Sequence, residues 1–368
     1  MKIGILTFHR AHNYGAMLQA FALKHILQGK GHHVEFISYR QPKIESAYKA
    51  FICNISRSNG IIGNVKNVLS AVITLYRRME RRRRFVQFME KNLPESKKYT
   101  KEELAAVILD YDAVFFGSDQ IWTTRFMGVF DDIYWGGVHL KEGKKIAYAP
   151  SMELKSVSEA EKTYIKKHIK NFDSVSARET HMSELLESIT GISIPTVADP
   201  TLLCTKNDYT PLILASKNVP KEPYVLVYQV GHHAMVDEIA QKVANQLHCR
   251  IIGIGSEVLL HHANTYKDGY GPEDFVALIA HATFVVSCSF HGTAFSVNFH
   301  KPFYSVLIRG LDSRATSFLS QVGLIQCGIR SIEEVDAPSM LGIDFLTVDD
   351  NLQRMRCKSI DYINNALA

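Results

Sequence analysis

The sequence predicts an α/β fold made of two doubly wound halves, each a parallel sheet covered by helices on both faces. Short apolar runs alternate with segments of helical period almost from end to end, which is the pattern of such sheets. The alternation restarts after an irregular stretch at residues 207–223, which we interpret as a linker. The length of 368 residues also fits two domains of roughly 150 residues each. We therefore predict domains over 1–206 and 207–368.

The predicted strands form two sets along the chain. In the first half they cover residues 3–7, 34–39, 113–116, 145–149, 174–177 and 195–198. In the second half they cover residues 224–230, 250–254, 284–287 and 303–307. We expect the last helix of the chain to pack back on the N-terminal domain.

A long helix over residues 61–92 is predicted within the N-terminal domain. Its apolar stripe, at spacings of three and four, consists of Ile62, Val65, Leu69, Val72, Tyr76 and Met79. The same helix carries Arg77, Arg78, Arg81, Arg82, Arg83 and Arg84, which together with Glu80 account for the whole net charge of +5. We favour a solvated polar face for these arginines. The alternative is peripheral contact with an anionic membrane surface, worth up to ~1 kcal/mol per basic residue.

Composition and spacing exclude several classes of protein. Outside the Arg cluster the charges balance, so we expect no nucleic-acid partner, which would require cations over a whole face. The six cysteines are never closer than 30 residues, and HExxH, GxSxG and GxxxxGK[ST] are absent, so we expect no bound metal. The N-terminus has no secretory leader, and no apolar stretch reaches the ~20 residues that span a bilayer. We therefore expect a cytoplasmic protein.

Polar clusters directly follow several of the predicted strands. They lie at residues 9–15, 117–120, 177–179, 199–200 and 287–293. In an open parallel sheet the ligand crevice lies outside the carboxyl ends of the strands. Five clusters at that edge predict one shared cleft.

The cluster at 287–293 is the most informative, because a strand ends there and an apolar helix begins. A helix N-terminus favours anions such as phosphate or carboxylate, which predicts an anion near Ser289, Gly292 and Thr293. His291 can both hydrogen-bond an anion and deliver a proton. The alternative is a capping serine beside a histidine with structural contacts alone.

Three polar residues outside that cluster are further candidates. Arg178 ends a strand, and a guanidinium binds carboxylate or phosphate through a bidentate fork, unless it only pairs with Glu179 or Asp173. Asp119, in the turn after a very apolar strand, is either a base for a hydroxyl or a helix cap. Asn13 and Gly15 form the tight first turn, where the amide of Asn13 is available to a ligand.

Five motifs together resemble those of the polysaccharide pyruvyl transferase family, in the family's order and over residues 1–325. They are Asn13-Tyr14-Gly15-Ala16-Met17-Leu18-Gln19-Ala20, Gly117-Ser118-Asp119-Gln120-Ile121-Trp122, Ser176-Ala177-Arg178-Glu179, Asp199-Pro200 and Ser289-Phe290-His291-Gly292. The resemblance implies two Rossmann-like domains of the GT-B architecture facing a cleft. It also implies phosphoenolpyruvate as donor and a sugar or lipid-linked oligosaccharide as acceptor, with a pyruvate ketal as product and no cofactor.

The resemblance implies catalysis by His291, with Asp119 opposite the donor. The expected donor-binding residues are Arg178, Ser289, Gly292, Thr293 and Arg314. All but Arg178 belong to the C-terminal domain. The expected acceptor-binding residues, all in the N-terminal domain, are His9, Asn13, Ser118 and Gln120. Other family members have Arg-Leu-His where this chain has Ser289-Phe290-His291. One cation is therefore missing near the donor, and Arg314, or else Arg309, is the candidate replacement.

Two other functions stay open at this point. A nucleotide-sugar glycosyltransferase of GT-B architecture would have the same strands and cleft, with Glu257 or Glu273 as candidates for a ribose carboxylate. A non-enzymatic binder of anionic membranes or nucleic acid would act through the Arg-rich helix. That second function leaves the polar clusters after five strands unexplained.

Overall fold

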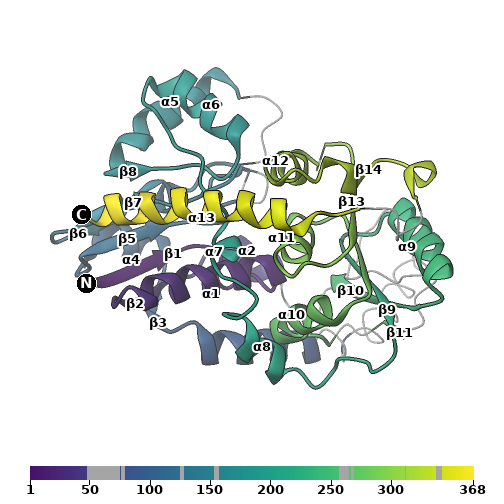
Figure 1. The fold of residues 1–368 in the computed structure, drawn as a ribbon. Helices are drawn as coiled ribbons and strands as arrows, with labels where there is room; N and C mark the ends of the chain where they lie inside the picture. The colour runs from purple at the N-terminus through teal and green to yellow at the C-terminus, as the bar shows by residue number, and fades with distance from the viewer. Residues whose placement is uncertain are drawn as a thin grey trace, which may run out of the picture.

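The computed structural model describes residues 1–47, 75, 79–124, 128–152, 157–256, 265–266, 269–310, 312–336 and 342–368. These residues form two six-stranded parallel sheets, one in each half of the chain (Figure 1). The strand orders are β3-β2-β1-β5-β7-β8 and β11-β10-β9-β12-β13-β14. Numbered along the chain, both sheets have the Rossmann order 3-2-1-4-5-6. The fold is the predicted α/β arrangement of two Rossmann-like domains.

The first sheet is built from strands that helices cover on both faces. Its strands are β1 (Lys2–Leu6), β2 (His33–Tyr39), β3 (Glu95–Tyr99), β5 (Ala113–Phe116), β7 (Lys144–Ala147) and β8 (Ser174–Val175). The helices of this half are α1 (Tyr14–Gly29), α2 (Pro42–Ala47), a helix over 79–92, α4 (Lys101–Ala106), α5 (Glu159–His168) and α6 (Thr180–Thr190). A two-stranded sheet of β4 (Ile108–Leu109) and β6 (His139–Leu140) lies beside them.

The second sheet repeats this plan. Its strands are β9 (Tyr224–Val230), β10 (Arg250–Ser256), β11 (Thr265–Tyr266), β12 (Phe284–Ser287), β13 (Phe303–Val306) and β14 (Gly328–Ile329). Its helices are α9 (Ala234–Leu247), α10 (Pro272–His281), α11 (Phe290–Asn298), α12 (Ser313–Val322) and α13 (Phe345–Leu367). The short helices α7 (Pro200–Leu203) and α8 (Thr210–Ala215) join the two halves, and α8 lies inside the predicted linker.

One predicted strand was wrong, and several short or polar strands, β3 among them, were not predicted. The segment 195–198 is no strand but makes one isolated bridge, between Ala177 and Thr196. Pro195 has no N–H to donate to a neighbouring strand, and Asp199 already caps α7. The residues between them are too few to extend the single bridge into a strand. Strand β3 was missed because its sequence, ESKKY, is polar. Edge strands often carry such charges, which prevent pairing with other chains.

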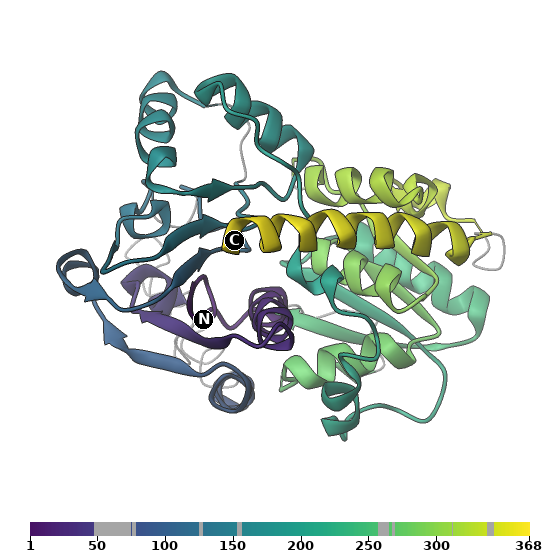
Figure 2. The ribbon, with the colours of Figure 1, turned by 60° about the vertical axis from the view of Figure 1, so that its left-hand side comes forward.

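The C-terminal helix α13 contacts both halves of the protein (Figure 2). In the second half it packs against α12. In the first half the Tyr362 hydroxyl donates a 2.9 Å hydrogen bond to the Ala147 carbonyl. The backbone N–H of Ala198 donates a 2.8 Å bond to the Ser359 hydroxyl. Both bonds lie at the carboxyl end of the first sheet, so α13 braces the region that leads to the site.

The aromatic ring of Tyr14 joins the two halves beneath that region. It stacks on Phe275 with ring centroids 4.9 Å apart and meets Tyr228 edge-on at 5.8 Å. Its hydroxyl donates a 2.9 Å hydrogen bond to the Tyr270 carbonyl. Tyr14 comes from α1 and its partners come from the second half, so the start of α1 is fixed against the other domain by a dry, buried contact.

Candidate active site

The carboxyl ends of the two sheets face one cavity of about 220 Å³. The N-terminal half contributes Phe8, Ala11, Asn13, Ala16, Asp119 and Gln120 to its wall, and the C-terminal half contributes Val230, His233, Cys288, Ser289, Phe290, His291 and Arg314. Most of these residues follow the first or fourth strand of their sheet, where the strand order reverses. Open α/β sheets bind ligands at this point, as the sequence predicted.

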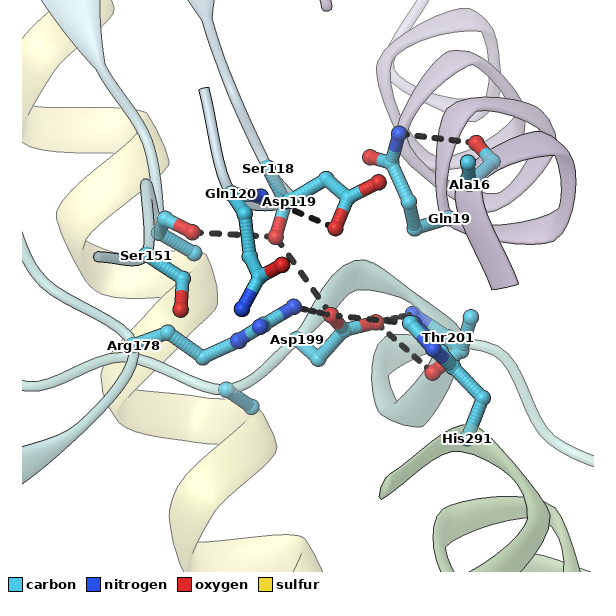
Figure 3. A network of polar contacts seen from close by, with 12 residues as sticks. Ala16, Gln19, Ser118, Asp119, Gln120, Ser151, Arg178, Asp199, Thr201 and His291 are labelled. Carbon is cyan, nitrogen blue, oxygen red and sulfur yellow. Dashed lines mark hydrogen bonds and ion pairs between the residues drawn. The ribbon is translucent and has the colours of Figure 1, made fainter. Parts of the chain in front are cut away.

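His291 lies in the first turn of α11, with its ring at the contact between the two halves (Figure 3). The residue is 7% exposed. A Cβ atom on Gly15 would lie 2.0 Å from His291 Nδ1, so the ring occupies the space that any side chain at position 15 would need. Gly15 therefore admits the histidine of the opposite domain, in addition to opening α1.

Asp199 is the hub of a buried polar network beside that ring (Figure 3). Its Oδ2 accepts a 2.7 Å hydrogen bond from Arg178 Nη1 and lies 3.6 Å from His291 Nε2, an ion-pair distance. Its Oδ1 accepts bonds from the backbone N–H and hydroxyl of Thr201, at 3.0 and 2.7 Å. Burial alone would raise the pKa of Asp199, but its contact with His291 and the charge of Arg178 hold that pKa well below its ordinary value.

Arg178 is buried between two carboxylates. Its Nη1 donates to Asp199, and its Nε donates a 3.1 Å hydrogen bond to Glu179. Burial alone would lower the pKa of Arg178, but the charges of Glu179 and Asp199 raise it. The guanidinium also lies over the Phe290 ring, 4.9 Å from its centroid. Its Nη2 amino group is buried and has no hydrogen-bond partner among the described residues. Arg178 was expected to bind the donor, but it does not line the 220 Å³ cavity.

Three of the predicted residues in the N-terminal half reach the cavity wall. Asp119 has a φ of 77° and its Oδ1 accepts the Gln120 backbone N–H at 2.8 Å. Gln120 Nε2 is buried and has no hydrogen-bond partner in the described part of the chain. Asn13 caps α1 by accepting from the Ala16 backbone N–H. A carboxylate and two amides thus share one side of the cavity.

Two other residues predicted to bind the acceptor do not line the cavity. His9 is buried, and its Nε2 lies 2.8 Å from Glu95, which also pairs with Arg10. Ser118 is fully buried, and its hydroxyl donates to the Ala149 carbonyl at 2.9 Å and lies 3.4 Å from Asp199. Both side chains support the loops around the site, so the geometry does not favour their acceptor-binding role.

Two of the expected donor-binding residues also turn away from the cavity. A Cβ on Gly292 would lie 2.1 Å from Ser287 Oγ, so glycine at this position lets α11 pack on the sheet. The Thr293 hydroxyl is buried 2.8 Å from Ser305 Oγ. The helix N-terminus faces the cavity through Ser289, Phe290 and His291 instead.

Arg314, from α12, lines the main cavity and also a second, adjacent one. The second cavity, of about 20 Å³, lies between Arg178, Phe290 and Ser317. A space of this size holds about one water molecule. The structure therefore brings Arg314 to the side of the site where the sequence predicted a replacement cation. Arg309, the other candidate, does not line either cavity.

The described part of the Arg-rich helix makes contacts within the chain. Arg81 Nη2 donates to the His12 carbonyl at 3.0 Å, and Arg83 and Arg84 pair with Glu80. Burial, followed by the charges of Arg81 and two other arginines, lowers the pKa of His12 to about 4. Arg77 and Arg78 lie outside the described residues. Membrane contact through this helix stays a prediction.

No helix among the described residues is long and apolar enough to cross a membrane. Within those same residues no three His, Cys, Asp or Glu side chains lie together in a way that could hold a metal ion. Of the two carboxylates considered for a nucleotide ribose, Glu257 lies outside the described residues. Glu273 lies in the first turn of α10 and lines neither cavity of the site.

The sequence model of a known family, described as polysaccharide pyruvyl transferase, matches residues 13–308. This chain belongs to that family. No curated protein matches it significantly. The match spans the loops that contribute Asn13, Asp119, Arg178, Asp199 and His291, so every part of the buried network lies within the pyruvyl transferase domain.

Solved structures with a similar fold have low sequence identity to this transferase family member. UDP-GlcNAc 2-epimerase from Methanocaldococcus jannaschii, in complex with UDP-GlcNAc and UDP, is 10% identical with a TM-score of 0.49, covering 96% of this chain and 92% of its own. The Neisseria meningitidis UDP-GlcNAc 2-epimerase bound to UDP-GlcNAc is 9% identical with a TM-score of 0.44, covering 100% of this chain and 94% of its own. The E. coli heptosyltransferase WaaC with ADP is 15% identical with a TM-score of 0.38, covering 85% of this chain and 90% of its own.

Two features of the pyruvyl transferase site were missed in the sequence. Gly15 was interpreted as part of a tight turn, although its contact is with His291 in the other domain. Asp199 was singled out by position but given no role, because its partners Arg178 and His291 are 21 and 92 residues away. The one local signal was that Asp199 directly precedes Pro200 at the start of a helix, a position typical of a helix cap.

Proposed function

We propose that this protein transfers the enolpyruvyl group of phosphoenolpyruvate to a pair of sugar hydroxyls, forming a pyruvate ketal in surface polysaccharide biosynthesis. Membership of the family supports pyruvyl transfer in general. The observation that carries the proposal is that His291 and Asp119, an imidazole and a carboxylate, line one cavity from opposite domains. An acid and a base so arranged can act on two substrates held between them.

The donor has a carboxylate and a phosphate, so its site needs several hydrogen-bond donors. We assign it to the C-terminal side, where the N-terminus of α11 presents backbone N–H groups beside Ser289 and His291. Arg314 supplies positive charge there. Arg178 lines the small adjacent cavity. Its charge is balanced within the protein, and we assign its Nη2 amino group to bond the anion from that side.

The acceptor is assigned to the opposite side of the same cavity. Gln120 and Asn13 present amide groups there, and amides hydrogen-bond sugar hydroxyls as both donors and acceptors. Asp119 is placed among them to receive a hydroxyl proton. A sugar or a lipid-linked oligosaccharide has the paired hydroxyls that this reaction consumes.

The reaction proceeds in two steps. Protonated His291 gives its proton to the methylene carbon of the donor, which becomes a methyl group, while the first sugar hydroxyl adds to the central carbon and Asp119 takes its proton. The second hydroxyl then attacks the same carbon, the bond to the phosphate oxygen breaks, and His291 takes that hydroxyl's proton. Asp119 returns its proton to the departing phosphate. Both side chains are restored, and the products are the ketal and inorganic phosphate.

The test is turnover with phosphoenolpyruvate and a panel of free and lipid-linked sugars that carry neighbouring hydroxyls. Release of inorganic phosphate and a new ketal methyl signal in the proton NMR spectrum are expected together. His291→Ala should lower kcat by about 10³-fold while the protein stays folded. Equal turnover by wild type and His291→Ala would contradict the proposal.

Ligand binding distinguishes this function from nucleotide-sugar transfer. Phosphoenolpyruvate should raise the melting temperature with increasing concentration, because it binds only the folded state. A rise with UDP-sugars or ADP-sugars, and none with phosphoenolpyruvate, would indicate a glycosyltransferase instead.

A further inference from the structure

We propose that Asp199 is a positioning residue for His291, and that Asp199 and Gly15 hold the ring from the opposite domain. The inference rests on the proposed function for the role of His291 as proton donor. It adds that the proton donor needs both domains: His291 comes from one, and Asp199 and Gly15, which hold its ring, come from the other. Nothing in the reaction scheme above uses Asp199 directly.

The carboxylate of Asp199 is held rigidly by its own half of the protein. Thr201 donates two hydrogen bonds to Oδ1, while Arg178 and Ser118 contact Oδ2 at 2.7 and 3.4 Å. The side chain of Asp199 is completely buried. Since these partners all come from residues 118–201, the position of the carboxylate is set without any contribution from α11.

The ring of His291 enters this arrangement from the other half. Its Nε2 faces Asp199 Oδ2 at 3.6 Å, and Gly15 lies against the ring close to Nδ1. Two fixed points in the N-terminal half, a carboxylate and a glycine, therefore limit how the ring can rotate. With Nε2 directed at Asp199, Nδ1 is the nitrogen left to exchange a proton with a substrate.

The charges around the ring give Asp199 a second effect. The titratable and charged groups that face this part of the cavity are Asp199, Arg178, Asp119, Arg314, His233 and Cys288. Among these groups, Asp199 is the one within ion-pair distance of the ring in the described structure. Removing its charge should therefore affect the ring more than a change at any of the others.

The principal test is Asp199→Asn, which keeps the shape of the side chain and removes its charge. We expect kcat to fall by roughly 10²-fold, with KM for phosphoenolpyruvate changed less than about threefold. In a plot of kcat against pH, the fall in kcat at high pH should begin about one pH unit or more lower than in wild type, because an opposite charge near the ring is lost. Asp199→Glu should recover part of the loss.

The matched control is Asp274→Asn. Asp274 is also a buried aspartate that accepts side-chain and backbone hydrogen bonds, from Ser216, Asn218 and the Gly271 N–H, but it does not line the cavity. Its substitution should lower stability while leaving kcat and the pH profile as in wild type. Equal changes in the pH profile for both variants would overturn the inference.

Gly15→Ala tests the other contact without changing any charge. The added methyl should displace the His291 ring and lower kcat at least tenfold, by analogy with the misplacement of other catalytic groups. Gly29→Ala is the control in the same helix, since a Cβ there meets nothing within 4 Å, and it should leave kcat unchanged. A folded Gly15→Ala protein with the kcat of wild type would overturn the inference. This test stands on its own if Asp199→Asn does not fold.

A readout independent of the reaction separates the two proposals. The NMR resonance of the His291 ring, identified by its loss in His291→Asn, should respond to pH differently in Asp199→Asn and in wild type. An unchanged response would overturn the positioning role whatever reaction the protein catalyses. A changed response, in a protein that forms no ketal with any acceptor, would support the positioning role and contradict the proposed function.

Discussion

The carboxyl ends of the two sheets have the same strand order but opposite chemistry. In the N-terminal half the site loops carry Arg178, Glu179 and Asp199, all buried, with both carboxylates paired to the arginine. In the C-terminal half the corresponding edge carries Ser287 and Thr293, whose hydroxyls bond to neutral groups. His291 belongs to this edge and finds its charged partner across the domain boundary.

This difference shows what topology does and does not fix. An identical strand order produces an identical crevice at each sheet. The loops then decide that one domain supplies a fixed charged framework and the other supplies a helix N-terminus and the imidazole. Neither edge alone places a carboxylate next to His291. The following predictions test that division between the two domains.

The largest effect on stability should come from Arg178→Ala. It leaves Asp199 and Glu179 buried without their cation, which costs about 3 kcal/mol or more of the free energy of unfolding. Urea denaturation measures the loss. The double variant Arg178→Met with Glu179→Gln should be less destabilised, and an Arg178→Ala protein as stable as wild type would mean that the framework is not held by this pair.

A pH-dependent effect should distinguish the two halves next. Burial alone would raise the pKa of Glu95, but hydrogen bonds from His9 and Arg10 lower it to about 2. Because the folded pKa lies below the unfolded value, the contribution to stability, on the order of 2 kcal/mol, is present above pH 4.5 and lost as pH falls towards 2.

Urea midpoints of wild type and Glu95→Gln should therefore differ at pH 7, and the difference should be clearly smaller at pH 3 and continue to shrink towards pH 2. Ser287→Ala, which removes the hydroxyl hydrogen bond to the Tyr228 carbonyl, should lower stability equally at both values. A Glu95→Gln difference that persists unchanged at pH 3 would argue against the paired carboxylate.

A smaller, pH-independent loss is expected on the neutral edge. Thr293→Val keeps the shape of the side chain but removes the hydrogen bond to Ser305, at a cost of about 1 kcal/mol. Adding Ser305→Ala should recover part of it, since no buried hydroxyl then lacks its partner. Thermal unfolding of the single and double variants measures both values. A larger loss in the double variant would contradict this account.

The smallest effect should come from the exposed arginines of the helix over 79–92. Arg82→Gln with Arg83→Gln should change stability by less than about 0.5 kcal/mol, because surface ion pairs contribute little. If the helix contacts anionic membranes, the same variant should bind vesicles with anionic lipid more weakly than wild type. Equal binding by both proteins would leave these arginines as a solvated face.

Much of the fold could be predicted because apolar strands identify themselves locally. The runs at 113–116 and 284–287 coincide with β5 and β12 as the structure has them. Polar edge strands such as β3 could not be identified, because their pairing with a neighbour, rather than their composition, makes them strands. The segment at 195–198 was misread for the converse reason, since its apolar residues are buried without joining a ladder.

The candidate site was predictable as a location but less so residue by residue. Asp119, Gln120, Asn13, Ser289, His291 and Arg314 line the cavity. His9, Ser118, Gly292 and Thr293 lie beside them in the sequence but turn into the protein. A loop sequence gives the position of the backbone at a sheet edge, whereas the direction of each side chain depends on which buried partner it finds.

The sequence by itself determined the class of fold, the two repeats of the strand order and the loops that meet at the crevice, because apolar periodicity and turn residues act over a few positions. Only the tertiary structure decided that Arg178 is neutralised, that Gly15 makes room for an imidazole, and that Asp199 faces His291. These are contacts between residues far apart in the chain and in different domains. Their energies depend on burial and distance, which no local pattern encodes.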